Sequence, residues 1–254
     1  MKNWKSGIKG IDLFWRVLGI FLIIVIWWIL KRFCEVSDRV LPSISDVFDA
    51  IDDFEPNLIL HTISTIQRLL IGFVFGVTFG IFLGLFIYKN IFLQRLFLPT
   101  IQAFRSIPPI ATVPFFILWF GFSELGKYVM VFSGIAFNIA IASYQILSYV
   151  PEKYQIMFKS FDIKPQNLIF EYMLPKIFEE LLPTIRFSLS TALGLVIVSE
   201  LLGAQIGLGY LIQTSRSTYS MHVIFLVMFI LGLISTVFDK LIVILWKNLI
   251  FWKK

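Results

Sequence analysis

Apolar residues are concentrated in six long runs along this chain. The runs fall at about residues 14–31, 66–88, 103–121, 128–148, 184–206 and 222–246. Each is close to the ~20 apolar residues that a helix needs to cross a bilayer. The pattern predicts an all-α, polytopic membrane protein with six transmembrane helices. The first run is expected to remain as a span, because no small-residue cleavage site follows it.

A polar stretch between the first two runs predicts a further helix. Residues 44–57 carry five carboxylates on an apolar frame spaced as one helical face. We therefore expect an amphipathic helix on the outer surface. A calcium-binding EF-hand loop does not fit, because the spacing of the carboxylates differs and the central glycine is missing. The chain then divides into residues 1–61, with the first span and this helix, and residues 62–254, with a five-helix core.

The longest polar interruption in the second half covers residues 151–186. Its first part predicts a short amphipathic helix, and Asp162 stands in the turn before Pro165, which suits the first turn of a new helix. Leu168 begins a second apolar face. The apolar face of the first helix is formed by Tyr154, Met157, Phe158 and Phe161. Such a helical flap is suited to docking in a groove of a partner protein.

Composition and charge agree with a membrane protein. Of the 254 residues, 58% are hydrophobic and 15% are charged, whereas soluble domains have about 45–50% apolar and about 25% charged residues. The net charge of +6 comes from basic residues that flank the apolar runs, so it indicates membrane topology and no nucleic-acid partner. Their distribution predicts that both termini and residues 151–186 are cytoplasmic.

The second predicted span carries a regular glycine pattern. Gly72, Gly76, Gly80 and Gly84 recur every four residues, which predicts close helix packing along one stripe.

The third span contains Arg105 followed by Pro108 and Pro109, and a broken helix beside an arginine is typical of a transport pathway. Alternatively, Arg105 extends to the inner membrane interface. Glu200, in the fifth span, is either a functional acid or the partner of an arginine on a neighbouring helix.

Several kinds of chemistry find no support in the sequence. Cys34 is the only cysteine, and His61 and His222 have no companion ligands, so we expect no metal site. The loop Gly121–Tyr128 lacks the Ser or Thr of a phosphate-binding loop. We therefore expect no cofactor on this chain and no enzymatic activity of its own.

A set of short motifs gives the chain a resemblance to a known family. The motifs are Leu41-Pro42-Ser43, Arg68-Leu-Leu-Ile-Gly72-Phe, Arg105-Ser-Ile-Pro108-Pro109, Leu118-Trp-Phe-Gly121, Met173-Leu174-Pro175, Arg186, Ser199-Glu200-Leu-Leu-Gly203-Ala and Gly207-Leu-Gly209-Tyr-Leu-Ile212. Over nearly its whole length the chain resembles the permease subunit of ATP-binding-cassette (ABC) importers, in the branch for nitrate, aliphatic sulfonates, taurine and similar solutes.

The resemblance implies a fold, partners and a location. The fold is that of a type I ABC importer permease. The partners are a second permease copy, a dimer of ATPase subunits that bind ATP and Mg²⁺, an extracellular or periplasmic solute-binding protein and the lipid bilayer. The location is the plasma (inner) membrane of a bacterium or archaeon.

The resemblance also implies a coupling loop at about residues 150–183. Family members carry E-A-A-x3-G and then I-x-L-P there, whereas this chain has Ile156-Met157-Phe158, Asp162 and an intact Leu174-Pro175. The implied ATPase-coupling residues are Tyr154, Met157, Phe158, Phe161, Asp162, Leu168, Leu174 and Pro175. This surface is bulkier and more apolar than the family pattern, so we expect either a roomier, apolar groove on the ATPase or weaker coupling to it.

The function expected from these observations is solute import driven by a separate ATPase. The pathway residues are predicted to be Arg105, Pro108, Pro109 and Glu200, with Arg105 as the cation for an anionic solute. The alternative is a channel or secondary carrier that works without an ATPase, for which only Glu200 offers an intramembrane ion site. An intramembrane enzyme would need a paired nucleophile and base, which the sequence lacks.

Overall fold

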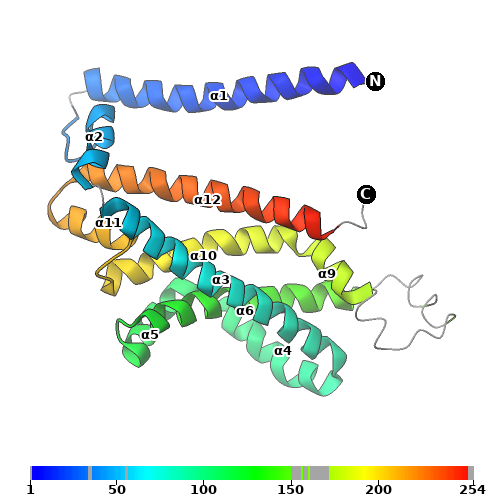
Figure 1. Ribbon diagram of the computed structural model, residues 1–254. Coiled ribbons are helices and arrows are strands. Elements are labelled where there is room, and N and C mark those ends of the chain that lie inside the picture. The colour runs from blue at the N-terminus through cyan, green and yellow to red at the C-terminus, as the bar shows by residue number, and fades with distance from the viewer. Residues whose placement is uncertain are drawn as a thin grey trace. The chain divides into compact units, whose positions relative to one another are not determined.

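The computed structural model describes residues 2–33, 36–54, 57–149, 156, 160 and 172–250, and the regular elements in this part of the chain are all helical. The elements are α1 (Lys2–Phe33), α2 (Ile44–Phe54), α3 (Asn57–Lys89), α4 (Ile91–Ser106), the 3-10 helix η1 (Pro109–Thr112), α5 (Val113–Phe120), α6 (Glu124–Ser148), α9 (Leu174–Glu180), α10 (Leu182–Gly203), α11 (Leu208–Ser217) and α12 (Met221–Leu249). Figure 1 shows them along the chain.

One of two compact units combines residues 1–58 with residues 212–228. Within it, the indole Nε1 of Trp27 donates a hydrogen bond to the carbonyl of Pro42 at 3.0 Å. The same indole lies 5.2 Å from the ring of Phe225, measured between centroids. These contacts join α1 to the segment before α2 and to the beginning of α12.

The amphipathic helix predicted over residues 44–57 is observed as α2. It begins with a capping box, in which the Ser43 hydroxyl accepts the N–H of Asp46 at 3.2 Å and the Asp46 carboxylate accepts the N–H of Ser43 at 3.3 Å. The hydrogen bond from the Ser43 side chain lowers the pKa of Asp46. The ionised carboxylate therefore favours the start of this helix.

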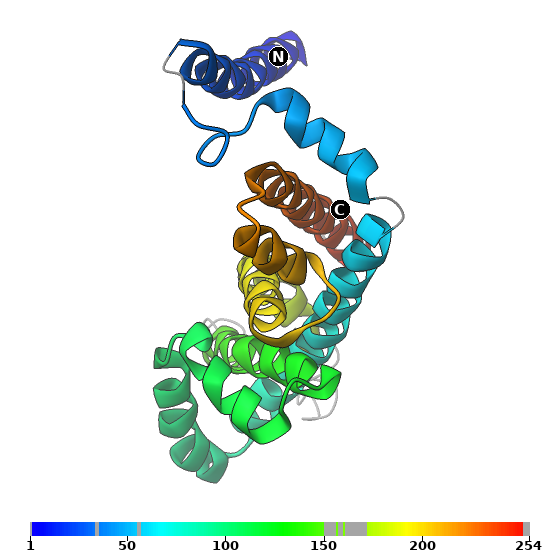
Figure 2. The same ribbon diagram turned by 90° about the vertical axis from the view of Figure 1, so that its left-hand side faces the viewer.

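The second unit contains residues 59–211 and 229–254, and its core is built on α6 and α10. The two helices run side by side (Figures 1 and 2). Ile135 and Ile139 of α6 are fully buried, as are Ala192 and Val196 of α10. Burial of these residues removes apolar surface from the surroundings and places both helices in the centre of the unit.

The helix α3 packs closely on α6 through its four evenly spaced glycines. A Cβ atom added to Gly80 or Gly84 would lie 2.7 or 2.5 Å from the backbone carbonyl oxygen of Ala136 or Ala140. Gly72 and Gly76 face side chains of α6 at similar distances. The absence of four side chains thus lets the two helices approach each other, as the spacing predicts.

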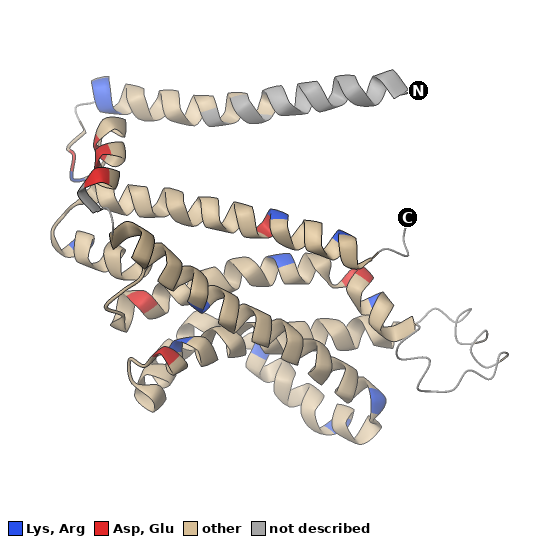
Figure 3. Cartoon of the chain, in the orientation of Figure 1, with Lys and Arg blue, Asp and Glu red and all other residues tan. Residues whose placement is uncertain are grey.

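Large apolar side chains cover another part of the surface of α3. Phe75, Phe82 and Phe86 are each more than 60% exposed. Contiguous apolar surface of this kind is rare on soluble monomers, and here it suits contact with lipid. Figure 3 shows that charged residues are sparse along the long helices.

Four of the described helices are long and apolar enough to span a membrane. They are α3, α6, α10 and α12, and a fifth span results if α4 and the η1–α5 segment count as one. The count of six, which includes α1, remains a prediction. The run at 103–121 is not a straight helix: α4 ends at Ser106, and the segment Pro109–Phe120 leaves it at 92°. Pro108 and Pro109 explain the break, because neither has an N–H to continue the helical hydrogen bonds.

Candidate functional site

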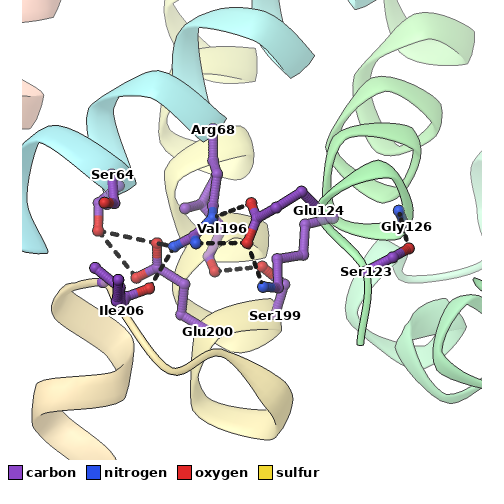
Figure 4. A network of polar contacts seen from close by, with 12 residues as sticks. Ser64, Arg68, Ser123, Glu124, Gly126, Val196, Ser199, Glu200 and Ile206 are labelled. Atoms are coloured by element: carbon purple, nitrogen blue, oxygen red, sulfur yellow. Dashed lines mark hydrogen bonds and ion pairs between the residues drawn. The ribbon is translucent and has the colours of Figure 1, made fainter. Parts of the chain in front are cut away.

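A polar network lies at the beginning of α6 and the end of α10, within the second unit. Its central cation is Arg68 of α3, whose side chain is 7% exposed. Thr65 precedes it by almost one helical turn and so lies on the same face of α3. Figure 4 shows Arg68 between the carboxylates of Glu124, from the first turn of α6, and Glu200, from the last turn of α10.

The guanidinium of Arg68 binds both carboxylates with short contacts. Its Nε and Nη2 atoms donate to the two oxygens of Glu124, each at 2.7 Å. Its Nη1 atom donates to Glu200 Oε1 at 2.7 Å and to the carbonyl oxygen of Ile206, also at 2.7 Å. The forked geometry of arginine permits this double pairing, which a lysine would not reproduce.

A second cation balances the charge of the network. Lys127 Nζ donates to Glu124 Oε1 at 2.8 Å, one turn into α6. The two cations, Arg68 and Lys127, thus face two carboxylates, of which Glu200 is fully buried and Glu124 is about half exposed. Buried charges are tolerated when they are paired and hydrogen-bonded in this way.

The same network holds the turn that leads into α11. Glu200 Oε2 accepts the N–H of Gly209 at 2.8 Å, and Thr65 Oγ1 accepts the N–H of Leu208 at 2.9 Å. His61 Nδ1 accepts the N–H of Gly207 at 2.9 Å. Three successive N–H groups at the beginning of α11, which have no partner inside the helix, therefore bind side chains instead.

Glycine is required at Gly207 in this turn. Its φ is +139°, a backbone conformation that residues with a Cβ rarely adopt. A Cβ added there would also lie 2.4 Å from the Glu200 carboxyl carbon. The Glu200 and Gly207-Leu-Gly209 motifs, separate in the sequence, therefore form one arrangement.

The chemistry of this network is structural. Its polar side chains are committed to one another or to backbone groups. The Thr65 hydroxyl, for example, donates to Glu200 Oε1 at 2.9 Å and accepts the N–H of Leu208 at 2.9 Å. Among the described residues, no group of three or more His, Cys, Asp or Glu side chains is placed to hold a metal ion. The arrangement fits a clasp that ties α3, α6 and α10 to the turn before α11. We call it the Arg68 clasp.

A second feature is a cavity beside the break between α4 and η1. It has a volume of about 380 Å³ and is lined by Arg105, by Pro109 and by residues of α5 and α6. Gly134 of α6 allows the break to lie close, because a Cβ there would be 3.3 Å from Pro109 and 2.3 Å from Leu195. The proline-rich break is thus packed against the core of the unit.

The site residues predicted from the sequence do not form one site in the structure. Arg105 and Pro109 line the cavity, Pro108 precedes η1, and Glu200 is in the Arg68 clasp, in the pairing with an arginine that the sequence left open. Leu174 and Pro175 form the first turn of α9. The other coupling residues lie outside the described residues: Tyr154, Met157, Phe158, Phe161, Asp162 and Leu168.

The sequence interpretation missed the partners of Glu200. Arg68 carried a signal, since it is a lone cation inside an apolar run. Glu124 and Thr65 carried none, because each is ordinary at a helix end or on a helix face. Their roles follow only from the packing of α3 against α6 and α10.

Comparisons with known proteins agree with the sequence motifs. Residues 76–250 match the model of the family described as binding-protein-dependent transport system inner membrane component. The aliphatic sulfonates transport permease protein SsuC of Bacillus subtilis is 28% identical over 235 residues, which cover 91% of this chain and 85% of SsuC. SsuC of Escherichia coli is 30% identical over 219 residues, with coverages of 85% and 83%.

Other relatives extend the comparison. The formylaminopyrimidine transport permease protein ThiX of Halalkalibacterium halodurans is 29% identical over 238 residues, which cover 93% of this chain and 95% of ThiX. An inward-facing structure of the MetNI methionine ABC transporter superposes with a TM-score of 0.57 at 23% identity, covering 74% of this chain and 97% of the matched chain.

This likeness shows a shared fold, and it confirms the predicted type I importer permease architecture. Because the family model covers more than half of the chain, the resemblance seen in the motifs is confirmed as well. The chain therefore belongs to the binding-protein-dependent transport system inner membrane component family, the permease subunits of ABC transporters, and is a transport subunit and not an enzyme.

Proposed function

We propose that this chain forms the membrane pathway of an ATP-driven importer for a small organic solute. The observation that supports this most directly is the broken helix at Pro108 and Pro109, beside a cavity bordered by Arg105. Interrupted helices at membrane depth are tolerated where they are buried in protein or line a cavity. In transporters, discontinuous helices of this kind form solute sites.

The driving force comes from a separate ATPase. A partner shifts the balance between inward-facing and outward-facing states only through its different affinity for the two. ATP binding to an ATPase dimer supplies that difference, and residues 150–183 transmit it to the membrane helices.

The helix α9 offers a route from this segment into the core. Ile177 and Leu181, within and directly after α9, are fully buried, and α9 packs against both α6 and α10. The indole Nε1 of Trp246 in α12 donates to the carbonyl oxygen of Phe178. A displacement of the segment before α9 would therefore move packed helices and not a free end.

The complete transporter contains more than this chain. A second copy or a close homologue completes the pathway, and an extracellular or periplasmic binding protein delivers the solute. The complex lies in the plasma membrane of a bacterium or archaeon with both permease termini in the cytoplasm. Relatives named for aliphatic sulfonates and formylaminopyrimidine support a small organic solute.

Reconstituted transport tests this function. The chain is placed in proteoliposomes with the ATPase and binding protein encoded beside it, and uptake of labelled sulfonates, taurine, nitrate and formylaminopyrimidine is measured with and without ATP. We expect uptake of one of these solutes only with ATP, and none with an ATPase variant that cannot hydrolyse it. Uptake by the chain alone, without ATPase, would instead establish a channel or secondary carrier.

A further inference from the structure

The cavity beside the broken helix lies against the middle of α6. One wall is formed by α6 through Ser133, Gly134, Phe137 and Asn138. These residues are near the middle of this 25-residue helix, which is about 37 Å long at 1.5 Å per residue. This wall of the cavity is therefore far from both ends of α6, and solute sites of transporters commonly lie near the membrane midplane.

Five of the thirteen residues that line the cavity are aromatic. Its volume of about 380 Å³ is within the range of about 300–1,000 Å³ that small-molecule sites occupy. Phe104 and Phe137 lie nearly parallel, with their ring centroids 5.9 Å apart. The aromatic residues that line the cavity are Phe104, Phe115, Phe116, Trp119 and Phe137. Such a lining favours an apolar, preferably flat, ligand body.

Three of the polar side chains around the cavity are bonded to their own helices. The hydroxyl of Thr112 donates to the carbonyl oxygen of Pro109 at 2.6 Å. The hydroxyl of Ser133 donates to its own helix at 3.0 Å, and the amide of Asn138 does the same at 3.3 Å. These groups therefore have part of their hydrogen-bonding capacity already in use.

Arg105 differs from these three groups. It lines the cavity, and no carboxylate in the described part of the chain lies within ion-pair distance of it. In contrast, Arg68 is fully paired in the clasp. The guanidinium of Arg105 is thus available to bind an anionic group, which it can do with two parallel hydrogen bonds.

We propose that this cavity binds the solute, and that the solute is an organic anion with an aromatic or similarly bulky apolar body. The proposal rests on the proposed function and narrows its solute class. Arg105 binds the anionic headgroup, and the aromatic wall binds the body. Small inorganic anions such as nitrate, and small solutes without an apolar body, would leave the aromatic surface uncovered and would bind weakly.

Equilibrium binding to the full chain in lipid nanodiscs tests this site without ATP or partners. The probes are benzenesulfonate and methanesulfonate, which share a headgroup and differ in the apolar body, with empty nanodiscs as the blank. We expect saturable binding of benzenesulfonate at least about tenfold tighter than of methanesulfonate. We also expect Arg105→Gln to weaken benzenesulfonate binding about tenfold or more, and Arg105→Lys to retain part of the affinity.

Arg95→Gln is the matched control. Arg95 is an exposed cation on the same helix, α4, and does not line the cavity. Its substitution should change the affinity less than about twofold, a difference of about 0.4 kcal/mol. Phe137→Ala should weaken benzenesulfonate binding and leave methanesulfonate binding unchanged.

The outcomes separate this site from the importer function. The site is overturned by the absence of saturable benzenesulfonate binding, by equal affinity for the two sulfonates, or by unchanged binding in Arg105→Gln. Uptake of a solute without such binding would overturn the site alone. Binding as expected, in a chain that transports without ATPase, would uphold the site and contradict the ATP-driven importer.

Discussion

At the scale of single residues, the side chain of Arg68 connects α3 to α6, to α10 and to the turn before α11, which no sequence motif predicted. Its one guanidinium contacts Glu124 of α6, Glu200 of α10 and the carbonyl oxygen of Ile206 in the turn before α11. Arg68 and Glu200 are both buried, and Arg68 is the cation that pairs with Glu200. Loss of Arg68 leaves the buried Glu200 carboxylate without its cation, and loss of Glu200 leaves the buried Arg68 with only the half-exposed Glu124.

Substitution of either residue should therefore destabilise the fold. We expect Arg68→Gln and Glu200→Gln each to lower the free energy of unfolding by about 3–5 kcal/mol. The double variant should lose clearly less than the sum, because its two changes remove one shared interaction. Denaturant unfolding of the purified chain in detergent, followed by circular dichroism, measures these values.

Arg186→Gln provides the comparison. Arg186 pairs with Asp239 through two hydrogen bonds, but its side chain is 48% exposed. Solvent screens an exposed pair, so the change in stability should be much smaller than in Arg68→Gln. Equal losses in Arg68→Gln and Arg186→Gln would show that burial of the clasp contributes nothing. Additive losses in the double variant would show that Arg68 and Glu200 do not stabilise each other.

The clasp also shows which side-chain pairings can be predicted from a sequence and which cannot. A glutamate in the fifth apolar run and an arginine in the second are costly in a bilayer, so each predicts a partner. The identity of that partner could not be predicted, because Arg68 and Glu200 are 132 residues apart. Glu124 gave no signal, since an acidic residue in the first turn of a helix is common.

At the scale of elements, α3 and α6 pack closely because α3 presents four glycines to α6. The four glycines leave no room for a Cβ, and at Gly80 and Gly84 the obstacle is backbone, which cannot rotate away. This interface was predictable because a four-residue spacing keeps small residues on one face of a helix. The partner helix was not predictable, since any neighbouring span could have filled the groove.

Alanine at Gly84 should therefore force the two helices apart. The new Cβ would lie 2.5 Å from the carbonyl oxygen of Ala140, and we expect a loss of about 1–3 kcal/mol in the free energy of unfolding. Gly232→Ala in α12 is the control, because nothing lies within 4 Å of its added Cβ. There the higher helix propensity of alanine should leave stability equal or raised. A Gly84→Ala chain as stable as the control would contradict the close packing.

The position of the break between α4 and α5 could be predicted from the sequence, but the angle between the two helical segments could not. Pro108 and Pro109 mark where helical hydrogen bonding must stop. Hydropathy merged the end of α4 with α5 into one run, because both flanks are apolar. The bend of 92° depends on how η1 packs beside Gly134 and Leu195, and that packing is absent from any local pattern.

At the scale of the whole molecule, composition and the apolar runs were sufficient for the membrane class. They also indicated the orientation through the distribution of Lys and Arg, which predicts that residues 151–186 share the cytoplasm with both termini. The family match supports a multi-pass protein of the inner membrane. The orientation itself is a prediction that accessibility can test.

Cysteine labelling in whole cells measures that orientation. In a Cys34→Ser background, Ser37→Cys should react with a membrane-impermeant maleimide added outside. Ser160→Cys should react only after permeabilisation, because it belongs to the predicted cytoplasmic segment. Both variants should react in permeabilised cells, which controls for a buried thiol. Labelling of Ser160→Cys in intact cells would reverse the orientation and remove the ATPase from the proposed mechanism.

The turn between α10 and α11 also fixes the number of residues between Glu200 and Gly209. Glu200 binds the N–H of Gly209, Arg68 binds the carbonyl oxygen of Ile206, and His61 binds the N–H of Gly207. One added or deleted residue between Glu200 and Gly209 would shift all of these backbone groups out of register. Related chains that keep the three side chains should consequently vary in length elsewhere, and this connection should remain free of insertions and deletions.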